Sequence, residues 1–396
     1  MGTRPVYRGH IPELDALRAF GITVVVLVHT WPYRPKQLWD LVQVGWITMD
    51  LFFVMSGFLI AGILLDSRAK PDYYKNFYTR RALRIVPVYW AVVGSIVVLL
   101  TLWNGPTYNR VAEEWGSAWW FVFYLGNIPT AINGTFMTAA GNCFTPLWSV
   151  QVEEQFYLLL PLLIHRLQPR VIARVLIGLA CLSPLIRLAI YLGYPTNELV
   201  QYVSLPCRME GFALGALIAV RFRLGPWDIP KRRLSIATVL VTAAWIAIAL
   251  LGGIKNTTPF NRTAGYLVSS VASAHIVLWL IVHRGSNATA WLRSSPVQSI
   301  GKVSYGMYLM HWPIMAVLIE VADRLEWKAL SDGTLKFPLV YALTFCCATL
   351  SWRYFENPIL GLRERLRPAP ADGAGAVPCR FPENAGNRVL TRAARF

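Results

Sequence analysis

Apolar residues fill eleven stretches of the chain, separated by polar or charged segments. Stretches of this kind predict membrane-crossing helices, because a helix needs about 20 mostly apolar residues to span a bilayer. The predicted fold class is therefore all-α, a polytopic helical bundle in a membrane. The stretches lie at 14–33, 46–65, 85–103, 118–132, 147–165, 175–193, 205–220, 234–252, 264–282, 303–320 and 337–357.

The fourth stretch differs from the rest. It is the shortest and contains Gly126, Asn127 and Pro129, so we expect a re-entrant or interfacial helix there rather than a crossing. About ten transmembrane helices remain, which places both termini on one side. Segments on that side carry 26 Lys and Arg, against 8 on the other. The positive-inside rule predicts that both termini are cytoplasmic.

Composition agrees with a membrane protein. Of 396 residues, 55% are apolar and only 15% are charged, with a mean hydropathy of +0.43. The net charge is +17, and the basic residues lie in short runs between apolar stretches. This placement is typical of residues that determine membrane topology, so we expect no nucleic-acid partner. The six cysteines show no metal-ligand spacing, and no metal site is predicted. We expect a cytoplasmic N-terminus at 1–13, a membrane domain at 14–360 and a disordered cytoplasmic tail at 361–396.

Ionisable residues within the apolar stretches indicate a functional site, because charge at membrane depth is costly. In the first stretch Arg18 and His29 are eleven positions apart, which places them on one helix face, about 16 Å apart in depth. Arg18 is predicted near the cytoplasmic end and His29 toward the outer third. The alternative is a snorkelling arginine and a histidine that is merely hydrogen-bonded inside the bundle.

Three carboxylates are predicted at the same outer depth as His29. Asp50 opens the second stretch, and Glu153 and Glu154 lie near the start of the fifth. A carboxylate against one imidazole nitrogen would fix the tautomer and raise the basicity of a general base. The alternative is that a glutamate caps a helix or pairs with Arg208.

Two further polar groups stand out. Arg80, Arg81 and Arg84 lie at the cytoplasmic start of the third stretch, where they either bind a polyanionic ligand such as a phosphate or simply mark the membrane boundary. His311 lies near mid-membrane beside Pro313, where it either contacts substrate or satisfies a kinked backbone.

Five motifs together resemble the acyltransferase-3 family of integral membrane acyltransferases. They occur in order over residues 14–358: LDALR at 14–18 with ten residues before His29, DLFFVMSGFLI at 50–60, RRxxRIxP at 80–87, WSVxVEEQFY at 148–157 and SYxxYLxHWP at 304–313.

This resemblance implies a multi-pass protein of the bacterial inner or plasma membrane, surrounded by lipid. The donor would be acetyl-CoA or another short acyl-CoA, and the acceptor a hydroxyl of a sugar or polysaccharide. The compact chain with an Ala/Arg-rich tail is also similar to macrolide O-acyltransferases, which predicts a macrolide acceptor and a role in antibiotic biosynthesis. A multi-span transporter with a buried proton relay is the alternative.

The resemblance also suggests roles for the candidate residues. His29 would be the general base, oriented by Asp50, Glu153 or Glu154, and a route through a transiently acylated His29 stays open. Either Arg18 or Ser149 would stabilise the oxyanion. The donor phosphates would be held by Arg18, Arg80, Arg81 and Arg84. The expected substrate-binding residues are Ser149, Glu154, Tyr157, Arg208 and His311.

Overall fold

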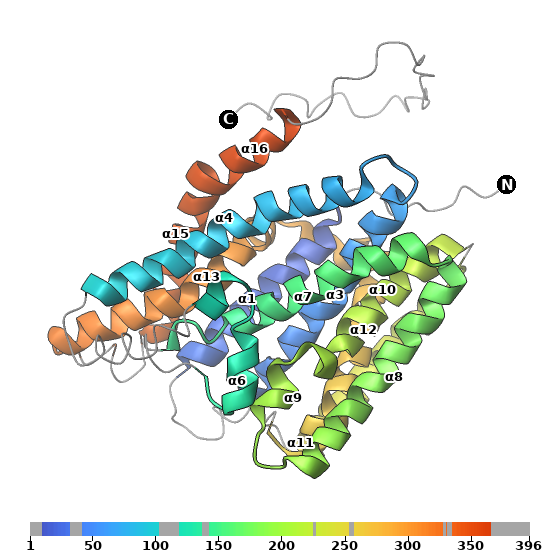
Figure 1. The fold of residues 1–396 in the computed structure, drawn as a ribbon, viewed down its shortest axis with the longest axis horizontal. Coiled ribbons are helices and arrows are strands. Elements are labelled where there is room, and N and C mark those ends of the chain that lie inside the picture. Colours follow the sequence, from blue (N-terminus) through green and yellow to red (C-terminus); the bar gives the residue numbers. More distant parts are fainter. Residues whose placement is uncertain are drawn as a thin grey trace.

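The computed structural model describes residues 10–31, 42–102, 119–136, 142–224, 227–252, 257–327, 330 and 335–365. In this part of the chain all regular secondary structure is helical (Figure 1). The first half contains α1 (Pro12–Thr30), η1 (Gln43–Ile47), α3 (Thr48–Ser67), α4 (Tyr73–Leu102), α6 (Asn127–Asn133), α7 (Leu147–Arg166) and α8 (Pro169–Gly193). The second half contains α9 (Leu199–Val203), η3 (Leu205–Cys207), α10 (Met209–Leu224), α11 (Lys231–Gly252), η4 (Asn261–Gly265), α12 (Tyr266–Val282), η5 (Asn287–Arg293), α13 (Ser295–Arg324), α15 (Lys336–Ser351), η6 (Trp352–Glu356) and α16 (Asn357–Arg365).

The chain is a multi-pass helical bundle, and every one of the ten predicted crossings coincides with a helix. Six helical segments are long and apolar enough to cross a bilayer: Gln43–Ser67, Tyr73–Leu99, Pro169–Gly193, Lys231–Ala249, Asn261–Val282 and Ser295–Arg324. The other four predicted crossings fall on α1, α7, α10 and α15. Of these, α1 and α7 carry several ionisable residues, and α10 and α15 have only 16 residues each. Ten crossings therefore remain a prediction.

Two other expectations concern the ends of elements. Within the fourth apolar stretch the described residues form a helical turn at 119–122 and the seven-residue α6, which is too short to span a membrane and agrees with a re-entrant or interfacial segment. At the C-terminal end, α16 continues to Arg365, so the first residues of the expected disordered tail are helical. The rest of that tail, and residues 1–9 of the N-terminal segment, lie outside the described residues.

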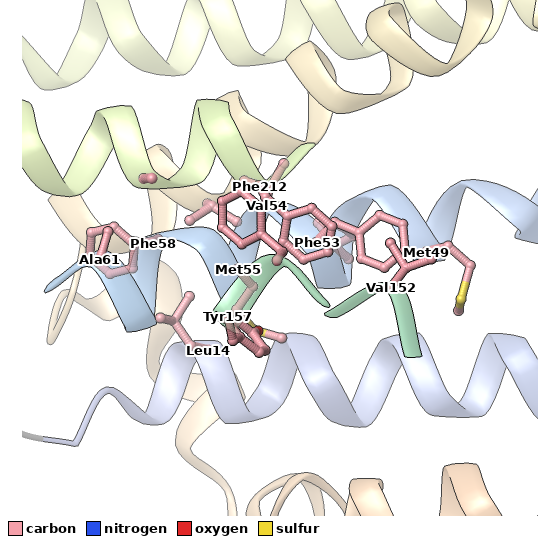
Figure 2. Packing of buried hydrophobic residues seen from close by; sticks show 14 of the residues in the cluster. Leu14, Met49, Phe53, Val54, Met55, Phe58, Ala61, Val152, Tyr157 and Phe212 are labelled. Atoms are coloured by element: carbon pink, nitrogen blue, oxygen red, sulfur yellow. The ribbon is translucent and has the colours of Figure 1, made fainter. Parts of the chain in front are cut away.

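The centre of the bundle forms around α3, which packs between α10 and α1 (Figure 2). Phe53 on α3 stacks on Phe212 of α10, with ring centroids 4.5 Å apart. Glycine permits this close approach, because a Cβ built on Gly215 would lie 1.9 Å from the carbonyl oxygen of Val54. Small residues at such crossings let two backbones meet inside a membrane bundle. The α3–α10 pair therefore provides a rigid frame for the polar residues at its ends.

Polar contacts connect the helix ends in two separate groups. At one group of ends, Asp66 pairs with Arg223 at 2.7 Å, and Arg68 donates to the carbonyl of His165. At the opposite ends, Asp50 at the start of α3 pairs with Arg208, which precedes α10. These pairings agree with the alternation of helix direction that the sequence predicts.

Candidate active site

Two histidines from distant parts of the chain form the centre of the site. The Nδ1 atom of His29, near the end of α1, lies 3.1 Å from Nε2 of His311 on α13. The rings are nearly parallel, with an interplanar angle of 16°. Trp312 packs edge-on against His29 at 4.6 Å between ring centroids. His311 is fully buried, whereas His29 is partly exposed.

The hydrogen bonds determine which nitrogen of His29 is free to take a proton. Nδ1 of His311 lies 2.6 Å from the backbone carbonyl oxygen of Tyr308, and a carbonyl only accepts, so this Nδ1 carries the proton. Nε2 of neutral His311 is then an acceptor, and Nδ1–H of His29 donates to it. His29 keeps an unprotonated Nε2. This is the tautomer that a general base requires.

His29 lines a cavity of about 480 Å³. A volume of this size is typical of small-molecule sites. Several aromatic side chains line it, including Trp46, Trp148, Tyr202, Tyr308 and Trp312. Polar residues lie among them, namely Gln43, Thr48, Thr145 and Thr257. The candidate base therefore faces a space that a substrate can occupy.

The carboxylates expected beside His29 have other partners. Asp50 accepts from Arg208 at 2.8 Å, and Ser270 donates to the same oxygen at 3.3 Å. Glu153 accepts from the hydroxyl of Ser56 at 2.8 Å. The imidazole ring of His29 instead forms a hydrogen bond with His311. The structure thus places a second imidazole where the sequence suggested a carboxylate.

Glu154 belongs to a different polar cluster. It binds Arg81 through two hydrogen bonds, of 2.6 and 3.1 Å. The Arg81 guanidinium also lies over the ring of Tyr157, 3.4 Å from its centroid. Because one edge of its guanidinium is bonded to Glu154 and one face is covered by Tyr157, Arg81 connects α4 to α7 rather than offering a free cation to a phosphate.

The three arginines of the basic run on α4 lie in different environments. Arg80 lines a second cavity, of about 370 Å³, together with Lys70 and Arg223. Arg84 is exposed and interacts electrostatically with Arg18. Arg18 itself donates to Asp15 at 2.7 Å. The candidate phosphate ligands Arg80 and Arg84 are therefore available, whereas Arg81 is paired.

The face of α1 between Arg18 and His29 is packed. Ile22 and Val25 occupy that face and are buried. A donor that reaches His29 from the side of Arg18 would need these side chains, or their neighbours, to move.

The candidates Ser149 and Arg208 do not line the cavity themselves, but each lies beside residues that do. The hydroxyls of Ser149 and Tyr308 are 2.6 Å apart, and Tyr308 also contacts the carbonyl of Pro146 at 2.8 Å. Arg208 is fully buried and lies 4.0 Å from the centroid of the Tyr266 ring.

Sequence reasoning did not select Tyr308, Trp148, Tyr202 or Trp312 as site residues. Tyr308, Trp148 and Trp312 lie inside the quoted motifs, so motif membership was an available signal. Tyr202 lies outside them, in the short helix α9, and only the tertiary structure brings it to the cavity.

Among the described residues, no group of three or more His, Cys, Asp and Glu side chains is arranged to hold a metal ion. The site is thus a histidine pair inside a helical bundle, in which His29 faces a cavity lined in part by aromatic residues and His311 is buried behind it. The chain belongs to the acyltransferase-3 family, since that family's model, described as an acyltransferase domain, matches residues 11–353.

Two relatives illustrate the similarity. The peptidoglycan O-acetyltransferase OatA of Listeria monocytogenes is 27% identical over 374 residues, covering 89% of this chain and 56% of the relative. The O-acetyltransferase OatA of Staphylococcus aureus is 28% identical over 371 residues, covering 88% of this chain and 57% of the relative. The chain thus spans somewhat more than half the length of these relatives. No solved structure matches. These names give no support to the narrower resemblance to macrolide O-acyltransferases.

Proposed function

We propose that this protein is a membrane O-acetyltransferase that moves an acetyl group from acetyl-CoA to a hydroxyl of a peptidoglycan sugar. Membership of the acyltransferase-3 family and the names of the relatives support the reaction and the acceptor class. The observation that carries the proposal is the unprotonated Nε2 of His29, which the hydrogen bond to His311 imposes beside a substrate-sized cavity.

In the proposed reaction His29 acts as a general base. Its Nε2 takes the proton of the acceptor hydroxyl while the hydroxyl oxygen attacks the carbonyl carbon of the thioester. The C–S bond then breaks, and the coenzyme A sulfur leaves with the proton that His29 returns. His311 accepts the hydrogen bond from Nδ1–H of His29 throughout the reaction, so His29 becomes an imidazolium without a change of ring orientation.

The proposed donor site lies at the other end of α1. Arg80 and Arg84 would bind the phosphates of acetyl-CoA, because arginine matches phosphate oxygens bidentately. Arg18 lies near Arg84 and adds positive charge. The acyl arm would extend toward His29 past Ile22 and Val25, which must separate to admit it. We place this end in the cytoplasm, on the side with the larger number of Lys and Arg residues.

Thiol release by the purified protein tests the proposal. Acetyl-CoA is supplied with a disaccharide of N-acetylglucosamine and N-acetylmuramic acid, and release should depend on the disaccharide. His29→Ala should lower the rate by about 10²- to 10⁴-fold, the usual contribution of a general base. His275→Ala, on α12 and outside the cavity lining, is the matched control and should keep the wild-type rate. Full activity of His29→Ala would exclude His29 as the base, and uptake by the wild type without thiol release would favour a carrier.

A further inference from the structure

One wall of the His29 cavity is a corner of two aromatic rings. Trp148, in the first turn of α7, and Tyr202, in α9, both line the cavity. Their ring centroids are 4.5 Å apart and their planes are inclined by 45°. The two rings therefore form one continuous aromatic part of the cavity wall.

A buried ion pair packs against both rings of this corner. The Arg208 guanidinium lies 5.5 Å from the centroid of Tyr202 and 6.0 Å from that of Trp148. Asp50 fixes Arg208 through a 2.8 Å ion pair, and both side chains are almost completely buried. Because Arg208 cannot move without separating from Asp50, the two rings have a rigid support.

Polar groups surround the apolar corner. Thr145 lines the same cavity, and its hydroxyl is buried without a hydrogen-bond partner in the described part of the chain. A buried hydroxyl without a partner costs free energy that a ligand can recover by bonding to it. Gln43 and Thr257 also line the cavity, and His29 completes it. The surface thus combines flat apolar faces with separate hydrogen-bonding groups.

We propose that Trp148 and Tyr202 form a binding platform for a pyranose ring of the acceptor, with the reacting hydroxyl directed at His29. This inference rests on the proposed function and adds the residues that select the acceptor. The C–H bonds on one face of a pyranose carry partial positive charge and match the negative face of an aromatic ring. The sugar hydroxyls at the edge of the ring would bond to Thr145 and its polar neighbours. A purely apolar acceptor would leave these groups unpaired.

The test compares substitutions at Tyr202. Tyr202→Leu removes the ring, so we expect the KM for the disaccharide to rise about five- to tenfold, the effect of losing one aromatic contact. The KM for acetyl-CoA should stay at the wild-type value, which a general structural defect would change. Tyr202→Phe restores the ring and should recover most of the lost affinity. Tyr194→Leu replaces an exposed tyrosine outside the cavity and should behave as wild type.

Binding without turnover separates this inference from the proposed function. Saturation-transfer NMR with the disaccharide and the His29→Ala variant should show transfer to the C–H protons of one sugar face, and addition of Tyr202→Leu should weaken it. If the sugar binds in this way but no thiol is released by wild type, the platform stands and the proposed reaction fails. If wild type turns over but Tyr202→Leu leaves the disaccharide KM unchanged, the platform is wrong. Stronger binding of a macrolide than of the disaccharide would also overturn it.

Discussion

The Nδ1 atom of His29 lies 3.1 Å from Nε2 of His311, although 282 positions separate the two residues in the chain. Because the carbonyl of Tyr308 occupies the other nitrogen of His311, the second histidine can only accept from the first. In the proposed mechanism His311 is therefore a positioning residue, a role that carboxylates fill beside many catalytic histidines.

Substitution of His311 should impair the chemical step more than substrate binding. His311→Leu removes the acceptor for Nδ1–H, so His29 can adopt the wrong tautomer or orientation, and kcat should fall by about 10²- to 10⁴-fold. The KM for acetyl-CoA should remain near the wild-type value. His311→Gln retains an acceptor oxygen and should keep more activity than His311→Leu. Steady-state kinetics of both variants checks this prediction, and equal losses in the two would contradict it.

Arg80 and Arg81 are adjacent but should respond differently to substitution. Arg80→Ala removes a positive charge from the second cavity, and the KM for acetyl-CoA should rise about tenfold, as expected for the loss of one charge-assisted phosphate contact. Arg81→Ala leaves Glu154 without its bidentate partner and should mainly lower thermal stability. Lys75→Ala, on the exposed side of the same helix, is the control for loss of a positive charge. An unchanged donor KM in Arg80→Ala would place the phosphates elsewhere.

The ion pair of Asp50 and Arg208 should matter greatly for stability when only one partner is removed. Asp50→Asn leaves the buried guanidinium without a counter-charge, and we expect a loss of about 3–5 kcal/mol. The double variant Asp50→Leu with Arg208→Met removes both charges and should recover a large part of that loss. Thermal unfolding of the detergent-solubilised protein measures both effects. A single variant as stable as wild type would show that the pair does not hold the bundle together.

Close contact between α3 and α10 predicts a contrast between two glycines. In Gly215→Ala the new Cβ meets the Val54 carbonyl, so the helices must separate, at a cost of about 1–3 kcal/mol. Gly178→Ala, on α8, places its Cβ where the described residues outside its own helical turn leave open space, and should be neutral or stabilising by up to about 1 kcal/mol. Melting temperatures of the two variants, measured in one detergent, decide this; equal destabilisation would refute the packing argument.

The sequence by itself determined where the helices lie, because a span depends on the local run of apolar residues and a bilayer demands that each crossing satisfy its own backbone hydrogen bonds. It also identified His29 as an unusual polar residue, since the cost of polarity at membrane depth is read from one segment alone. The sequence did not determine which side chain contacts that histidine. Depth alone allowed Asp50, Glu153 or Glu154 to meet it, and the structure instead brings His311 to 3.1 Å. Which of several side chains at one depth become neighbours depends on how each helix is rotated and packed, and only the tertiary structure decides that.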